Sequence, residues 1–266
     1  ASAGASLTPS PAIATTLPNL FVGVNAALRG IPELSFGDVV GGNVVDLTLV
    51  TSLAVLVSGG IIAESRMVQT SSLFTLLIAV LPLLLSLDGQ LGRIDGLVLI
   101  LAFFLYAAWL FNTEERFSKV YGKGEKGKSL WKNVFLLAVS FIMLIAGSQG
   151  VVISALFFAK FLGMSIGLIG ILIVGLGNCM PEIYFSVISA KKGQSWLILG
   201  DLMGSVIYSA TLVLGIVALI SPINIIDFSP YFLARVFLII SAVFFLVFLR
   251  SGKKITRKEA FFLLGI

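Results

Sequence analysis

The chain has 266 residues, of which 58% are apolar and 12% charged, and its mean hydropathy is +1.08. Soluble domains are about 45–50% apolar and about 25% charged, so this composition excludes an ordinary soluble protein and indicates a membrane protein. The net charge of +5 does not indicate nucleic-acid binding, because the basic residues lie in short loops. The absence of histidine excludes histidine metal sites, and the single cysteine excludes a disulfide within the chain.

About eight apolar runs are long enough to cross a membrane, which takes about 20 helical residues. In chain order they are Thr8–Leu28, Leu34–Ile62, Ser71–Leu87, Ile94–Phe111, Val134–Phe158, Ser165–Ala190, Trp196–Ile220 and Phe228–Leu249. The first begins weakly, at Pro9 and Pro11, and is expected to lack an upstream helix. The tail Lys258–Ile266 is expected to begin another span. The sequence therefore predicts an all-α, multi-pass protein of a cell or organelle membrane, with the lipid bilayer as a partner.

Basic residues fall mostly on one side of the predicted membrane. Fourteen of the eighteen belong to that side: Arg66, Arg116, Lys119, Lys123, Lys126, Lys128, Lys132, Lys191, Lys192, Arg250, Lys253, Lys254, Arg257 and Lys258. The other loops carry Arg29, Arg93 and Lys160. Loops rich in Lys and Arg stay in the cytoplasm, so the first side is predicted to be cytoplasmic.

The stretch Leu176–Glu182, inside the apolar run Ile166–Ile188, carries the strongest signal of a site. Pro181 removes one helix hydrogen bond and crowds the carbonyl of Gly177. Such a break is tolerated at membrane depth where the freed carbonyls face protein or a polar cavity. Glu182 adds a carboxylate, which is costly at that depth and by default functional. Together these oxygens indicate a site for a dehydrated cation.

A second copy of this arrangement lies 163 positions upstream, without gaps. The aligned positions are Pro18 with Pro181, Asn19 with Glu182, Gly37-Asp38 with Gly200-Asp201, Gly41 with Gly204, and Thr48–Val50 with Thr211–Val213. Shared apolar composition does not explain such a match, so we infer an internal duplication. Five predicted spans separate equivalent positions, and this odd number places the copies in opposite orientations. In inverted repeats of this kind the substrate site lies near the membrane midplane, where the repeats meet.

The duplication divides the chain into three parts. Residues 1–112 are predicted to form a first repeat that lacks its first helix. Residues 113–132, rich in Lys, Glu and Gly, are predicted to form a charged cytoplasmic linker. Residues 133–266 are predicted to form the second, inverted repeat, with an incomplete last helix.

The candidate site is built from oxygen-bearing side chains around the two proline motifs. Asp46 lies one helical turn beyond Gly42, and the equivalent pair in the second copy is Ser205 and Ser209. The predicted ligands are Glu182, Asp46, Asn19, Ser209, Thr15, Thr16, Ser205 and Asn178. Ca²⁺ takes about 6–8 oxygens, and two carboxylates would neutralise one divalent ion. The alternative is that burial keeps these carboxyls protonated, or that they hydrogen-bond to helix ends.

Other polar residues within the predicted spans have two interpretations each. Asp38 and Asp201 either cap the starts of their helices or help ions to reach the site. Cys179 is expected to be a small packing residue rather than a ligand. Arg235 is expected to extend to the outer membrane interface.

The motifs resemble the α-repeats of the calcium/cation antiporter superfamily, which includes the sodium/calcium exchangers. That family's Gly-Thr-Ser-x-Pro-Glu/Asp motif corresponds to Ala14–Asn19 and Gly177–Glu182. Its Gly-Asn-x-x-Gly-Ser-Asn-type motif corresponds to Gly37–Asn43 and Gly200–Val206. The order, the spacing and the inverted topology match over nearly the whole chain.

The resemblance implies a ten-helix fold, of which this chain looks like helices two to nine, and alternating-access exchange of Ca²⁺ for Na⁺. It implies that the repeat acids bind the ions and that nearby Thr, Ser and Asn oxygens complete the shell. The chain departs from the pattern at Asn19, where the family has an acid, and at Ser209, where it has Asn or Asp. Asn178-Cys179 also replaces a Thr-Ser pair. Na⁺, K⁺ and H⁺ therefore all stay open as counter-ions.

As an antiporter, the protein is expected to have no enzymatic activity and no cofactor. Two other functions stay open. An intramembrane aspartyl protease would use Asp38 and Asp201, but Ile198 stands where that group has glycine, and the proline motifs would be unexplained. A diverged homologue that no longer transports is the third possibility. The oligomeric state is not indicated by the sequence.

Overall fold

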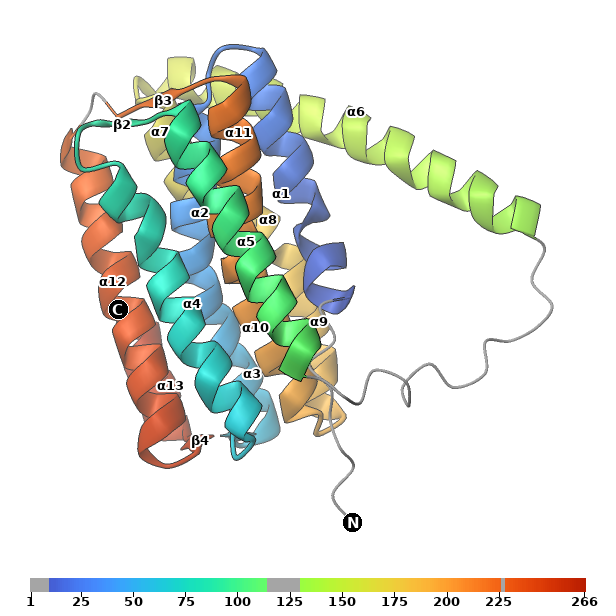
Figure 1. The fold of residues 1–266 in the computed structure, drawn as a ribbon, viewed down its shortest axis with the longest axis vertical. Helices are drawn as coiled ribbons and strands as arrows, with labels where there is room; N and C mark the ends of the chain where they lie inside the picture. The colour runs from blue at the N-terminus through green and yellow to red at the C-terminus, as the bar shows by residue number, and fades with distance from the viewer. Residues whose placement is uncertain (1–9, 114–129, 226–227) are drawn as a thin grey trace.

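The computed structural model describes residues 10–113, 130–225 and 228–266. Most of the predicted linker, 113–132, and the start of the first predicted span at Thr8 lie outside the described residues. We refer to residues 10–113 as the first half and to the described residues from 130 onward as the second half. Figure 1 shows a bundle of long helices, most of which run roughly side by side.

The helices of the first half are α1 (Ser10–Leu28), α2 (Glu33–Val45), α3 (Thr51–Ser58), α4 (Arg66–Leu85) and α5 (Arg93–Thr113). Those of the second half are α6 (Leu130–Leu162), α7 (Ile166–Ile169), α8 (Gly175–Asn178), α9 (Met180–Lys191), α10 (Ser195–Tyr208), α11 (Leu214–Ile220), α12 (Phe228–Ser251) and α13 (Arg257–Leu264). In the described part of the chain, three π-helical segments join neighbouring helices: η1 (Asp46–Val50), η3 (Gly170–Val174) and η4 (Ser209–Val213).

Seven helices in the described residues are long and apolar enough to cross a membrane. They are Glu33–Ser58, Arg66–Leu85, Arg93–Asn112, Val134–Leu162, Ile166–Lys191, Ser195–Ile220 and Tyr231–Ser251, and they confirm the second to eighth predicted spans. The first predicted span corresponds to α1, a helix of 19 residues that is not among these seven. The predicted helical tail is α13, which begins with a capping box between Thr256 and Glu259. The chain is an all-α, multi-pass integral membrane protein.

The structure repeats itself at the spacing found in the sequence. Segments η1 and η4 begin at Asp46 and Ser209, which are 163 residues apart. Two short antiparallel strand pairs also correspond: β1 (Ile61–Ile62) pairs with β4 (Lys254–Ile255), and β2 (Gln90–Leu91) pairs with β3 (Ile223–Asn224). Each pair joins the first half to the second, and the pairs lie at opposite ends of the bundle (Figure 1).

Glycines let the two halves approach closely at the centre. Segment α2 packs along α7, η3 and α8. A Cβ atom added to Gly41 would collide with the backbone of Ile171, and one added to Gly175 would collide with the backbone of Gly42. Small residues at such crossings allow helix backbones to touch inside a membrane. The crossing therefore brings the residues around Asp46 next to those around Cys179.

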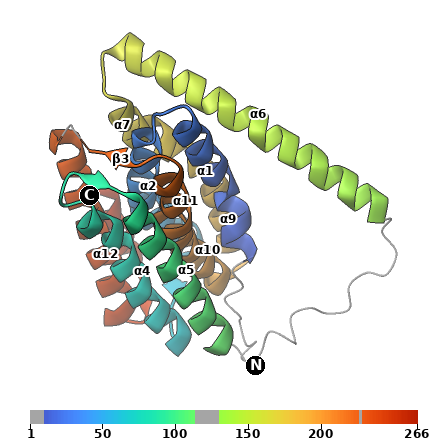
Figure 2. The same ribbon diagram turned by 45° about the horizontal axis from the view of Figure 1, so that its top comes forward.

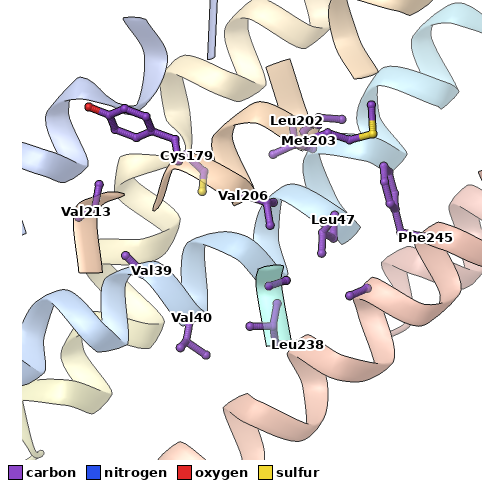
Figure 3. Close-up of a cluster of buried hydrophobic side chains, with 14 of the residues drawn as sticks. Val39, Val40, Leu47, Cys179, Leu202, Met203, Val206, Val213, Leu238 and Phe245 are labelled. Atoms are coloured by element: carbon purple, nitrogen blue, oxygen red, sulfur yellow. The ribbon is translucent and has the colours of Figure 1, made fainter. Parts of the chain in front are cut away.

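The apolar core surrounds this crossing. Figure 3 shows Leu47, Met203, Val206 and Phe245 together with Cys179 as members of one cluster of buried side chains. In contrast, α6 contacts α1, α7 and η3 and leans away from the bundle towards its N-terminal end (Figure 2). The candidate site thus lies in the tightly packed part of the molecule.

Candidate cation site

The second proline motif interrupts its helix, whereas the first does not. In the second half, α8 ends at Asn178 and α9 begins at Met180, with Pro181 in its first turn. In the first half, α1 runs continuously through Pro18. The predicted break of both helices is therefore confirmed for the second copy and wrong for the first. Glycine favours helix less than other residues except proline. Gly175 and Gly177 precede the second proline, whereas the first copy has Ala at the position of Gly177.

Asp46 and Glu182 meet at one hydroxyl group. Ser205 on α10 lies with its Oγ 2.9 Å from Oδ2 of Asp46 and 3.4 Å from Oε1 of Glu182. These three side chains come from η1, α9 and α10, and each is at most 2% exposed. The structure thus brings together both predicted carboxylates and a predicted hydroxyl ligand.

Each of these carboxylates keeps one oxygen without a hydrogen bond. Among the described residues, neither Oδ1 of Asp46 nor Oε2 of Glu182 has a partner. Asn19 on α1 is 5% exposed, and its Oδ1 also has no partner in the described part of the chain. Buried polar oxygens normally have a partner, because leaving one without a partner costs about 1–3 kcal/mol. These atoms are the ones that a dehydrated cation would use.

Ser209 and Thr16 are held by contacts within the protein. Ser209 donates a 2.7 Å hydrogen bond to Oδ1 of Asn43 on α2. Thr16 is fully buried and donates to the backbone carbonyl of Ala12 in its own helix. Both hydroxyl oxygens retain lone pairs that could coordinate a cation. Asn43 was not predicted as a site residue, although it ends the Gly37–Asn43 motif.

Asp38 and Asp201 form equivalent contacts in the two halves. The Nδ2 of Asn178 lies 3.0 and 2.9 Å from Oδ1 and Oδ2 of Asp38, and Thr15 donates to Oδ1 of Asp201 at 3.1 Å. The capping interpretation is wrong for both aspartates, because α2 and α10 start at Glu33 and Ser195 without a side-chain cap. Both carboxylates instead bond to predicted site residues.

Cys179 and Arg235 have structural roles in this conformation. The Cys179 thiol is buried and donates to the carbonyl of Gly42 at 3.4 Å, as expected for a packing residue. The side chain of Arg235 reaches the C-terminal end of α4, which adjoins a predicted outer loop, so its extension to the outer membrane interface stays a prediction. Its guanidinium is buried and bonds to Oγ and the carbonyl of Ser86, at 2.9 and 3.2 Å. Ser86 is the C-cap residue of α4, and a cation is favourable at the negative end of a helix.

No group of three or more Asp, Glu, His or Cys side chains is placed to hold a metal ion within residues 10–113, 130–225 and 228–266. A cation at this site would therefore depend on Asn, Ser and Thr oxygens as well as on the carboxylates. Such mixed oxygen ligands suit hard cations, such as Ca²⁺, rather than metals that prefer thiolate or imidazole.

Comparison with known proteins agrees with this fold. The family model described as sodium/calcium exchanger protein matches residues 11–112 and 132–266. The structure of the sodium-calcium exchanger NCX_Mj soaked with Na⁺ and Sr²⁺ superimposes with a TM-score of 0.71 and 25% sequence identity. The match covers 98% of this chain and 83% of that one.

Relatives from three organisms share between 26% and 32% of aligned residues. An uncharacterized membrane protein of Methanocaldococcus jannaschii is 28% identical over 73% of this chain, a match that spans 63% of that relative's length. The inner membrane protein YrbG of Escherichia coli is 26% identical over 95% of this chain and 80% of its own. The sodium/calcium exchanger MaX1 of Methanosarcina acetivorans is 32% identical over 48% of this chain and 36% of its own.

The family match covers most of the chain, and the structural match covers nearly all of it. The matched family and the matched structure are both exchangers rather than enzymes, so the hypothesis of an intramembrane aspartyl protease is wrong. The resemblance seen in the motifs is confirmed. The chain belongs to the sodium/calcium exchanger protein family.

Proposed function

We propose that the protein is a secondary active antiporter that exchanges Ca²⁺ for Na⁺ by alternating access, at a site between its two halves. The observation that carries this proposal is that Asp46 and Glu182 both contact the hydroxyl of Ser205. The second oxygen of each carboxylate has no hydrogen-bond partner among the described residues. Two buried carboxylates with free oxygens provide the charge for one divalent ion or for two monovalent ions.

The site supplies more oxygens than the two carboxylates. Asn19 contributes an unpartnered amide oxygen, and Ser205 lies between the two acids. The remaining proposed ligands are Thr15, Thr16, Asn178 and Ser209. With water, this set would reach the roughly 6–8 oxygens that Ca²⁺ takes.

Charge neutralisation would couple the two fluxes. A charge at the centre of a membrane costs several kcal/mol, so the empty site with two ionised carboxylates would not change sides easily. Ca²⁺ or Na⁺ would remove that penalty by binding the same oxygens. Because the ions compete for one site, movement of one in one direction would require movement of the other in the opposite direction. Simultaneous binding of Ca²⁺ and a full load of Na⁺ would contradict this mechanism.

The second candidate function is exchange of Ca²⁺ for H⁺, and K⁺ is tested as a further counter-ion. Protons can neutralise the two carboxylates that share Ser205, and Asn19 and Ser209 carry no charge for additional Na⁺ ions. The test is Ca²⁺ uptake into proteoliposomes holding the full-length protein, with an outward gradient of Na⁺, K⁺ or H⁺.

Uptake that requires the Na⁺ gradient and is lost in Glu182→Gln would support the proposal. The exposed Glu64 provides the matched control, since Glu64→Gln should leave uptake unchanged. Uptake driven by H⁺ but not Na⁺ would establish the second candidate. Wild-type protein that takes up no Ca²⁺ under any gradient, or a Glu182→Gln variant with normal uptake, would refute Ca²⁺ exchange at this site.

A further inference from the structure

The mechanism above does not use Asp38 and Asp201, although both are fully buried in membrane-spanning helices. Their partners are related by the internal repeat, because Thr15 and Asn178 are 163 positions apart, as the aspartates are. Each hydrogen bond also crosses between the halves: Thr15 on α1 donates to Asp201 on α10, and Asn178 on α8 donates to Asp38 on α2. The molecule therefore contains the same inter-half contact twice.

The two contacts differ in how many carboxylate oxygens they occupy, because an amide nitrogen carries two hydrogens and a hydroxyl carries one. Both oxygens of Asp38 lie within 3.0 Å of the Asn178 amide nitrogen. Asp201 accepts from Thr15 through Oδ1, while its Oδ2 has no partner in the described residues. An amide N–H carries positive partial charge and points at the lone pairs that a cation would use. Asp38 is thus blocked towards a cation in this conformation, whereas Asp201 keeps one oxygen available.

Asn178, which bonds to Asp38, also lies at the wall of two cavities. It lines two cavities, of about 400 and 210 Å³, which share Val151 of α6 as a second lining residue. Asn178 directly precedes the break at Cys179, and Glu182 lies four residues further along. Movement of the Asn178 side chain would therefore change both the opening of these cavities and the start of the ion-binding turn.

We propose that Asp38 and Asp201 are a reciprocal pair of positioning residues for cation exchange. Both contacts are formed in this conformation, and each carboxylate would release the proline motif of the opposite half when the site opens to one particular side of the membrane. The released carboxylate offers oxygen to a passing cation. This inference rests on the proposed antiport, and it adds two residues whose effects should be specific to opposite sides of the membrane.

The flux test uses Asp38→Asn and Asp201→Asn, which keep the side-chain shape, in the full-length protein reconstituted with known orientation. The apparent KM for Ca²⁺ is measured separately from each side. A hydrogen bond to a charged group is worth enough to change an affinity about tenfold. We expect each substitution to raise KM about tenfold on one side only, the two on opposite sides. Equal changes on both sides, or no change, would overturn the inference, and Asp88→Asn in an exposed loop is the matched control.

A second test does not need transport. Cys179 is the single cysteine of the sequence and adjoins Asn178, so its reaction with a small methanethiosulfonate reagent reports on the Asp38 contact. Asp38→Asn should raise the labelling rate, while Asp201→Asn and the exposed Ser140→Ala should leave it unchanged. Equal labelling of all variants, or equal acceleration by both aspartate substitutions, would contradict the reciprocal roles. If wild-type protein fails to transport, the proposed function fails and the inference fails with it. Normal wild-type transport with equal labelling of all variants would refute the inference alone.

Discussion

Ser209 donates a hydrogen bond to the side-chain oxygen of Asn43 across the interface between the two halves. The bond is 2.7 Å long, and both residues are at most 2% exposed. It connects η4 of the second half to α2 of the first, next to the carboxylates of the candidate site. Loss of this bond would leave a buried amide oxygen without a donor.

We therefore expect Ser209→Ala to reduce the free energy of unfolding by about 1–3 kcal/mol, the cost of a buried polar group without a partner. The measurement is thermal unfolding of the purified protein in detergent. Ser140→Ala, on the exposed face of α6, removes a hydroxyl from another span and should leave the melting temperature unchanged. A Ser209→Ala variant as stable as the wild type would show that this contact does not stabilise the interface.

Asn19→Glu should strengthen Ca²⁺ binding. The substitution places a carboxylate where an unpartnered amide oxygen now lies, at the first-half equivalent of Glu182. A further negative charge attracts a divalent ion more strongly than a monovalent one, so we expect the Kd for Ca²⁺ to fall about tenfold, equivalent to about 1.4 kcal/mol. Calorimetric titration measures it, and Asn19→Gln controls for the longer side chain. Weaker Ca²⁺ binding by the glutamate variant would place Asn19 outside the ion shell.

Ca²⁺ should stabilise the folded protein through Asp46 and Glu182. A ligand that binds only the folded state, at about 100 times its Kd, adds about 2.7 kcal/mol to stability. The melting temperature should therefore rise on addition of Ca²⁺ and fall when a chelator removes it. Asp46→Asn and Glu182→Gln should abolish this rise, whereas Glu64→Gln should keep it. An undiminished rise in both site variants would mean that Ca²⁺ binds elsewhere.

Gly41→Ala should destabilise the crossing of α2 with η3. The added methyl group would collide with backbone atoms of Ile171, which cannot move as a flexible side chain does. Overpacking of this kind costs about 1–3 kcal/mol. The control is Gly147→Ala on α6, where the structure leaves open space around the added carbon. Thermal unfolding compares the two variants, and equal melting temperatures would contradict the close contact.

The sequence predicted the helical membrane fold and the helix break at the second proline motif, because both depend on local chemistry. Long apolar runs indicate spans, and a glutamate next to proline at membrane depth is costly enough to indicate a function. The spacing of 163 positions reappears in the structure, where η1 and η4 occupy equivalent positions. Asp46 and Glu182 were expected to lie together, and Ser205 joins them.

The partners of Asp38, Asp201 and Arg235 could not be predicted, because they come from helices distant in the sequence. In the sequence, the position of Asp38 near a helix start is compatible with capping. In the structure, the crossing of α2 with α8 places Asn178 beside this carboxylate. In the same way, the hydrogen bonds of Arg235 to Ser86 depend on the packing of α12 against α4, which the sequence alone does not show. The continuity of α1 through Pro18 was also not predicted, because the two proline motifs were read as equivalent although the first has Ala14 where the second has Gly177.

The two strand pairs limit how the halves can move. The pairs β1–β4 and β2–β3 join the first half to the second at opposite ends of the bundle. The halves are therefore hinged at both ends, and while both pairs stay formed the molecule cannot open by one half swinging away from the other. A change of access would instead require sliding of the elements between these hinges.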